Sequence, residues 1–115
     1  MPRFITLAAY TNEGTAGLID GDSDRRAVME VMHQSVGATL VDYCLTRGVY
    51  DFYVISDADS FEQIAAMTLK AKASGTVSNP ITLEAVDIDA MRAMVKKVEF
   101  TPPSESSGRT ITTGE

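Results

Sequence analysis

Two β-rich runs, residues 38–45 and residues 49–57, are separated only by Thr46-Arg47-Gly48. A connection this short, with a glycine that can take a positive φ, predicts an antiparallel β-hairpin. Directly opposed residues share a face of a sheet, so the pairing decides what each face carries. With Leu45 opposite Val49, one face carries the pairs Tyr43–Asp51, Val41–Tyr53 and Thr39–Ile55, and the other carries Cys44–Tyr50, Asp42–Phe52 and Leu40–Val54. Both faces are largely apolar, and a slip of one residue leaves them so.

The residues before the hairpin predict one strand and one helix. Alternation from Phe4 to Tyr10 predicts the strand. Residues 14–21 are punctuated by glycines and are predicted as a loop. A helix is expected to begin at Asp22 or Ser23, whose side chains can cap it, and to end at Gly37. Its apolar residues at four-residue spacing are Val28, Met32 and Val36.

The residues after the hairpin complete a βαββαβ order. Ser60 and Gln63 have the spacing of a capping box, which predicts a helix that continues to about Ser74 and stops at Gly75. A strand over residues 81–86 follows Asn79-Pro80. A last helix is expected after Asp87 or Asp89, with the apolar residues Ile88, Met91, Val95 and Val98. The order predicts an α+β, ferredoxin-like fold with a four-stranded antiparallel sheet and an extra C-terminal helix.

One domain is expected over residues 1–100, because the chain has 115 residues and domains usually have roughly 100–150. The composition changes at Thr101. Residues 101–115 are polar and rich in Pro and Ser, and Ile111 is their only large apolar residue. Composition alone therefore predicts a disordered tail, and packing of this tail on a neighbouring chain is the alternative.

The apolar second face of the sheet predicts an assembly. Two helices cover only one face, and an antiparallel sheet whose other face meets water normally carries polar residues there. Leaving several large side chains in water forgoes roughly 25 cal/mol per Å² of apolar surface. We therefore expect a homodimer that packs sheet on sheet, with a higher oligomer also open. The alternative is that the last helix and the tail cover this face.

The charge excludes several classes of partner. The formal net charge is −6, from 16 acidic and 10 basic residues, which gives no general electrostatic reason to bind nucleic acid or an anionic membrane. No apolar stretch approaches the ~20 residues that span a bilayer, and the N-terminus shows no signal peptide. A disulfide framework is impossible with Cys44 alone. We therefore expect a cytoplasmic protein with no nucleic-acid or membrane partner.

Few residues have the pattern of a metal or nucleophile site. Asp20-Gly21-Asp22-Ser23-Asp24 resembles the start of a calcium loop, but Arg25 and Val31 stand where that loop needs Gly and Glu. Acids at a helix start are the preferred interpretation. His33, the only histidine, cannot form a His-rich metal site alone and is expected to face solvent. Cys44 is expected to be buried as a small apolar side chain.

A carboxylate next to tyrosines is the strongest candidate for chemistry. Asp51, with Tyr43 and Tyr50, lies on an otherwise apolar sheet, where desolvation would raise its pKa and suit it to proton transfer. His33 is an outside candidate. Asp51 could equally accept backbone N–H bonds and hold the hairpin. The sequence has no Gly-rich phosphate loop, Ser-His-Asp arrangement or paired-Cys spacing, so neither a cofactor nor a metal is expected.

At this hairpin the chain resembles the GYD-domain family, named for a Gly-x-Tyr-Asp signature that stands here as Gly48-Val49-Tyr50-Asp51. The resemblance covers about residues 3–98. It takes in Thr11-x-x-Gly14, Gly37, Leu40-Val41-Asp42, Leu45-Thr46, Gly75 and Thr82-Leu83-Glu84-Ala85. Two departures, both in loops, are Val36-Gly37, where many members have a glycine pair, and Asn79-Pro80.

The resemblance implies a dimeric α/β barrel, in which ferredoxin-like protomers pair through their sheets, and it implies no settled reaction. Two functions follow. The first is a non-catalytic module that binds small molecules or assembles. The second is a cofactor-independent enzyme of monooxygenase or isomerase type, acting on a small apolar or aromatic substrate through Asp51 with Tyr43 or Tyr50. The sequence has few clusters of titratable residues, which favours the non-catalytic module. The fold by itself does not imply an enzymatic activity.

Overall fold

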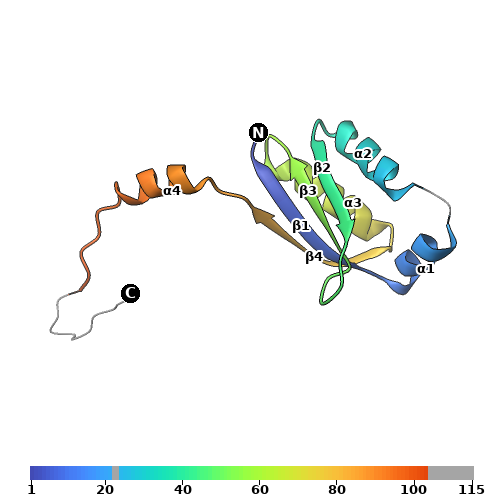
Figure 1. Ribbon diagram of the computed structural model, residues 1–115. Coiled ribbons are helices and arrows are strands. Elements are labelled where there is room, and N and C mark those ends of the chain that lie inside the picture. Colours follow the sequence, from blue (N-terminus) through green and yellow to red (C-terminus); the bar gives the residue numbers. More distant parts are fainter. Residues whose placement is uncertain (22–23, 104–115) are drawn as a thin grey trace. The chain divides into compact units, whose positions relative to one another are not determined.

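A computed structural model describes residues 1–21 and 24–103 (Figure 1). The chain divides into a first unit, Met1–Ala85, and a second unit that begins at Val86. The elements of the first unit are β1 (Arg3–Tyr10), α1 (Asn12–Asp20), α2 (Arg25–Ser35), β2 (Thr39–Leu45), β3 (Phe52–Asp57), α3 (Phe61–Ala73) and β4 (Val77–Glu84). The second unit contains α4 (Ile88–Val95), which Asp87 caps as predicted but which stops short of Val98.

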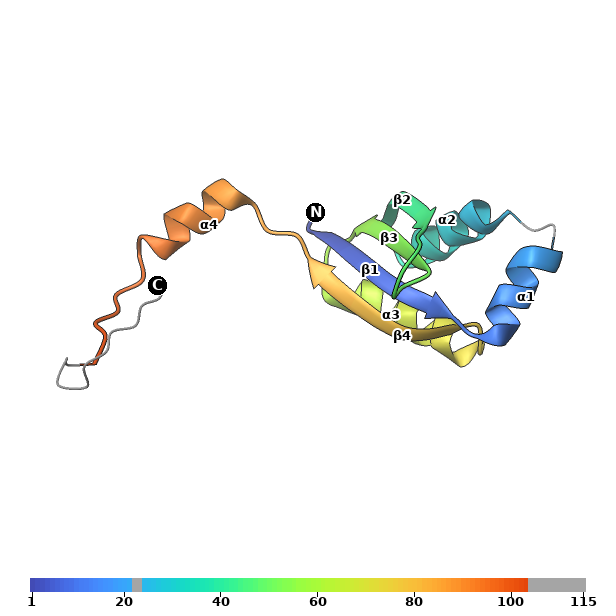
Figure 2. The same ribbon diagram turned by 60° about the horizontal axis from the view of Figure 1, so that its bottom comes forward.

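The first unit has a ferredoxin-like α+β fold, as predicted. Its four strands form one antiparallel sheet in the order β2-β3-β1-β4. Figures 1 and 2 show α2 and α3 on the same face of this sheet, which leaves the opposite face uncovered by helices of this unit. No helix in the part of the chain that the structure describes has the length and apolarity to cross a membrane.

The core lies between the sheet and these two helices and consists of two clusters. One joins Phe4 to α3 through Ile64 and Met67, with Ala38 and Ala58 beside them. The other is formed by three strand residues, Ala8, Phe52 and Val54. The capping box at the start of α3 is confirmed, because the Gln63 side chain accepts the Ser60 N–H at 2.9 Å.

The hairpin loop is longer than predicted. β3 begins at Phe52 rather than Val49, and Leu45 pairs with Phe52, so the register differs by three residues from the expected one. The main chain of Asp51 explains the difference. Its N–H donates to the Ala8 carbonyl at 2.9 Å, and its carbonyl accepts the Thr46 N–H at 2.8 Å. Phe52 then faces the helices, where it is 6% exposed.

This change of register moves β2 side chains to the other face. Tyr43 now shares the helix-covered face with Val54, whereas Cys44 lies beside Tyr53 on the uncovered face. An irregularity between Leu40 and Asp42 returns Leu40 to the covered side. Both faces stay apolar, because β1 and β3 alternate as the sequence indicates.

Three other boundaries differ from prediction. Residues 12–20 form α1 instead of a loop, since Thr11 caps them through the Gly14 N–H at 3.1 Å. β4 begins at Val77 rather than residue 81, because Asn79 takes a φ of 51° and the strand continues through an irregularity. α2 is capped by Asp24, while the predicted caps Asp22 and Ser23 lie outside the described residues, as does most of the predicted tail.

Candidate functional site

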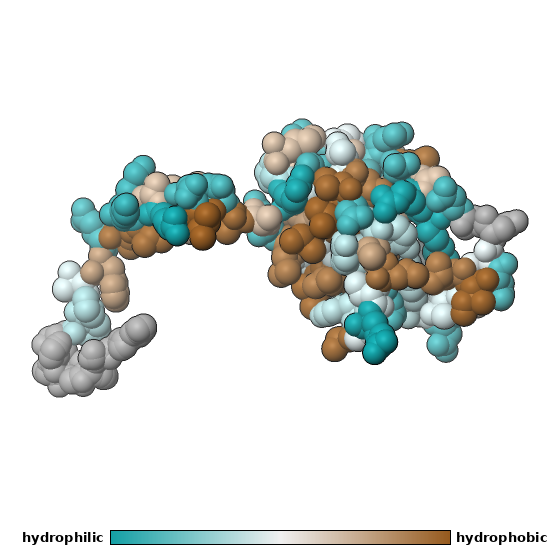
Figure 3. Space-filling model, viewed as in Figure 1, coloured by the Kyte–Doolittle hydropathy of each residue, from teal (hydrophilic) through white to brown (hydrophobic). Residues whose placement is uncertain are grey.

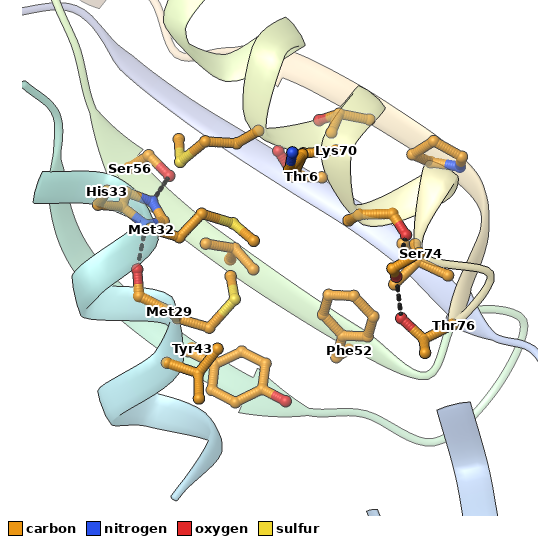
Figure 4. A pocket seen from close by; sticks show the side chains of 18 of the residues that line it. Thr6, Met29, Met32, His33, Tyr43, Phe52, Ser56, Lys70, Ser74 and Thr76 are labelled. Carbon is orange, nitrogen blue, oxygen red and sulfur yellow. Dashed lines mark hydrogen bonds between the residues drawn. The ribbon is translucent and has the colours of Figure 1, made fainter. Parts of the chain in front are cut away.

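A cavity of about 500 Å³ lies between the sheet and its two helices (Figure 4). It follows from the strand order, because α2 packs on the edge strand β2 and α3 packs on the opposite edge strand β4. The central strands β1 and β3 then form a floor that neither helix fills. This volume is in the range of about 300–1,000 Å³ typical of small-molecule sites.

The lining of the cavity is mostly apolar. Met29 and Met32 come from α2, Met67 comes from α3, and the sheet supplies Ala8 and Phe52. Further apolar residues are Val28, Val54, Ile64, Ala71, Val77 and Pro80. Methionine is flexible and polarisable and adapts to irregular ligands. The lining therefore suits a small apolar or aromatic molecule.

His33 is buried, not exposed to solvent as expected, and it lines the cavity with Ser56. Its Nδ1 lies 2.7 Å from the Met29 carbonyl, and its Nε2 lies 2.7 Å from Ser56 Oγ. A carbonyl only accepts hydrogen bonds, so in the neutral ring Nδ1 carries the hydrogen and Nε2 accepts from the Ser56 hydroxyl. Both polar side chains are thereby satisfied inside an apolar wall.

Two tyrosines line the cavity at its other end. The hydroxyls of Tyr10 and Tyr43 lie 2.5 Å apart, and the Tyr10 ring stacks on Phe52 with centroids 4.7 Å apart. Burial, followed by the hydrogen bond to Tyr43, raises the pKa of Tyr10 well above its usual value. The Arg25 guanidinium lies 5.6 Å from the centre of the Tyr10 ring. Tyr10 therefore stays protonated and its hydroxyl remains a donor.

Of the predicted carboxylate–tyrosine group, only Tyr43 lines the cavity. The Asp51 carboxylate accepts the Tyr10 N–H at 2.8 Å, which joins the hairpin loop to the end of β1. The Tyr50 carbonyl accepts the Thr46 hydroxyl at 2.6 Å within the loop. These contacts match the structural role that was left open for Asp51.

Ser56 and Tyr10 line the cavity but were not among the predicted site residues. The strand alternation places both side chains on the helix-covered face of the sheet. Their neighbours on that face, Phe52, Val54 and Ala8, are buried. A polar group at such a position needs an internal partner. The strand alternation alone therefore indicates that Ser56 needs a hydrogen-bond partner on a helix, but it does not identify that partner.

Cys44 is exposed on the uncovered face rather than buried. There the Tyr53 hydroxyl donates to the Asp42 carboxylate at 2.9 Å. This bond, followed by one to Cys44, raises the pKa of Tyr53 to about 12. The same bond lowers the pKa of Asp42, with Arg26 adding to the effect.

Among the residues that the structure describes, no three His, Cys, Asp or Glu side chains are grouped to hold a metal ion. Asp22 and Ser23 of the sequence that resembles a calcium loop lie outside those residues.

The chain matches a family model and is similar to a curated protein and to a solved structure. The family model described as the GYD domain matches residues 4–95. A Thermus thermophilus protein described as a glutamine synthetase and cystathionine beta-lyase binding protein is 27% identical over 96 residues, which are 84% of this chain and 100% of that protein. A solved structure described as the crystal structure of FFRP-DM1 has a TM-score of 0.48 and 18% identity, covering 75% of this chain and 100% of its own.

Proposed function

The chain belongs to the GYD-domain family, and from this premise we propose that it is a non-catalytic binding module. Each protomer holds a small apolar or aromatic molecule between α2, α3 and the sheet, and two protomers pair through the uncovered faces of their sheets. The observation that carries the proposal is the cavity of about 500 Å³ with its largely apolar lining. Binding sites of this kind need a preformed apolar space and a few placed polar groups.

A binding role fits the polar groups of the cavity better than catalysis does. Asp51 is the candidate carboxylate for proton transfer. It accepts a hydrogen bond from the Tyr10 N–H and is not among the residues that line the cavity. His33 and Ser56 satisfy one another and the Met29 carbonyl. The Thermus thermophilus relative is described as a binding protein, which supports a module that also contacts other proteins.

The enzyme alternative keeps one specific observation in its favour. Ser56, His33 and the Met29 carbonyl form a chain of two 2.7 Å hydrogen bonds in the cavity wall, and a hydroxyl next to an oriented imidazole is the arrangement that activates a nucleophile. Tyr43 lines the same space. Turnover of an aromatic ester by the wild type, lost in Ser56→Ala, would favour this alternative.

The homodimer is proposed from the uncovered face of the sheet. Ile5 and Leu7 on β1 pair with Leu83 and Ile81 on β4, and all four side chains lie on this face. Leu83 is 49% exposed within the protomer. Figure 3, drawn in the same view as Figure 1, shows hydrophobic surface on this unit. Apolar surface of this extent typically marks an interaction site.

Leu83→Asp is expected to convert the dimer to a monomer, because it places a charge on the apolar face. Light scattering coupled to size-exclusion chromatography measures the mass. Val31→Asp is the matched control, because Val31 is 65% exposed on α2, away from this face, and it should leave the dimer intact. A monomeric wild type would contradict the proposed assembly and favour coverage of the face by the last helix.

Ala71→Phe is expected to weaken ligand binding at least about tenfold, because the ring would occupy the space between α3 and the sheet. Binding is measured by the fluorescence of the neutral probe N-phenyl-1-naphthylamine. Ala66→Phe adds the same ring to an exposed position of α3 that does not line the cavity, and it should bind as the wild type does. Equal binding by both variants would place the ligand elsewhere.

A further inference from the structure

The charged side chains that line the cavity are both cations. Arg25 and Lys70 are the two, and no carboxylate is among the described lining residues. The chain as a whole has 16 acidic and 10 basic residues. The charge of the lining is therefore opposite in sign to the net charge of the chain. A cavity with a local charge of one sign selects ligands of the other sign.

The two cations come from the two helices that flank the cavity. Arg25 is the first residue of α2 and lies over the Tyr10 ring at 5.6 Å. Lys70 lies in the last turn of α3, which leads into the start of β4 where Val77 pairs with Tyr10. Figure 4 shows Lys70 beside Thr6, and Ser74 and Thr76 across the cavity from His33 and Ser56. Arg25 and Lys70 therefore supply the positive charge of the lining.

Neither cation is committed to an ion pair among the described residues, where Arg3, Arg26 and Arg92 are the paired cations. Arg25 donates one hydrogen bond, from Nη2 to the Gly14 carbonyl at 3.3 Å. A guanidinium has five N–H donors, so most of its capacity stays available. The raised pKa of Tyr10 keeps a neutral hydroxyl donor beside it.

We propose that the ligand is an amphiphilic anion, with an apolar or aromatic body against the methionines of the two helices and one carboxylate-like head bound by the cations of the lining. This inference rests on the proposed binding function and names its ligand class. An aliphatic and an aromatic acid share this chemistry. The head accepts charge-assisted hydrogen bonds from Arg25, which binds carboxylates bidentately, and the body buries its apolar surface against Met29, Met32 and Phe52.

Two fluorescent probes with the same aromatic body test the proposal. 1-Anilinonaphthalene-8-sulfonate carries one anionic group, and N-phenyl-1-naphthylamine lacks it. The wild type is expected to bind the anion about tenfold more tightly, and the double variant Arg25→Gln/Lys70→Gln is expected to lose this preference while it binds the neutral probe unchanged. The unchanged neutral probe also shows that the variant is folded.

Arg26→Gln/Lys72→Gln is the matched control. It also removes one arginine charge from α2 and one lysine charge from α3, at residues that do not line the cavity, although Arg26 donates to the Tyr43 carbonyl at 2.9 Å. It should keep the preference for the anion, which excludes a simple effect of net charge. The preference is also expected to shrink at high salt, because salt screens partly exposed charges.

The outcomes separate the two proposals. If both probes bind equally to the wild type and Ala71→Phe weakens both, the binding function stands and the anionic ligand class is wrong. If the matched control loses the preference as well, the ligand class is also wrong. If Ala71→Phe affects neither probe, the cavity does not bind them, and the proposed function and this inference both fail.

Discussion

Gly14→Ala is expected to destabilise the protein by roughly 3 kcal/mol, which lowers the melting temperature by roughly 15 °C. Gly14 is buried in the first turn of α1. A Cβ there would overlap the Thr76 carbonyl oxygen and lie 3.0 Å from its carbonyl carbon. Neither backbone can move easily, because the Thr76 carbonyl also accepts the Thr11 N–H at 3.1 Å. Thermal unfolding followed by circular dichroism measures the effect.

Gly17→Ala is the matched control for this substitution. Gly17 lies one turn later in α1, and a Cβ there meets only the end of the Arg25 side chain at 3.2 Å. Alanine favours a helix by roughly 1 kcal/mol relative to glycine, so this variant should be as stable as the wild type or slightly more so. If Gly14→Ala and Gly17→Ala had the same melting temperature, α1 would not pack closely against the turn before β4.

His33→Ala is expected to cost about 3 kcal/mol in the free energy of unfolding. His33 is 1% exposed, and its removal leaves a void. It also leaves the hydroxyl of Ser56, a residue that is 2% exposed, without its hydrogen-bond partner. Each of these effects costs roughly 1–3 kcal/mol. Denaturation by urea measures the change, and Gln34→Ala, at the exposed neighbouring position, should change little.

A second pair of variants separates the void from the lost hydrogen bond. Replacing both partners by apolar groups, as in His33→Leu/Ser56→Ala, removes the stranded hydroxyl and refills most of the space. This double variant should be more stable than His33→Ala alone. If His33→Ala were as stable as the wild type, the buried pair would contribute nothing to the fold.

The sequence predicted the order of the elements except for α1, because the signals for the others were local. The alternation from Phe4 to Tyr10 and the capping box at Ser60 depend on residues within a few positions of one another. The hairpin register was not predictable in this way. It depends on the bond from the Asp51 N–H to the Ala8 carbonyl, a contact between residues far apart in the chain.

The candidate site was predictable only in part for the same reason. Tyr43 was named and lines the cavity, but its partner Tyr10 belongs to another strand. His33 was expected to face solvent, whereas its buried ring bonds to the Met29 carbonyl on its own helix and to the Ser56 hydroxyl on β3. Asn79 has a positive φ that propensity rules do not anticipate before a proline.

The binding cavity is tested most directly by methyl NMR of the methionines during titration with N-phenyl-1-naphthylamine. The chain has six methionines, and Met29, Met32 and Met67 line the cavity whereas Met1, Met91 and Met94 do not. The expected result is that the signals of the first three shift and those of the other three stay in place. Shifts confined to Met91 and Met94, or no shift at all at saturating probe, would contradict a binding cavity between α2, α3 and the sheet.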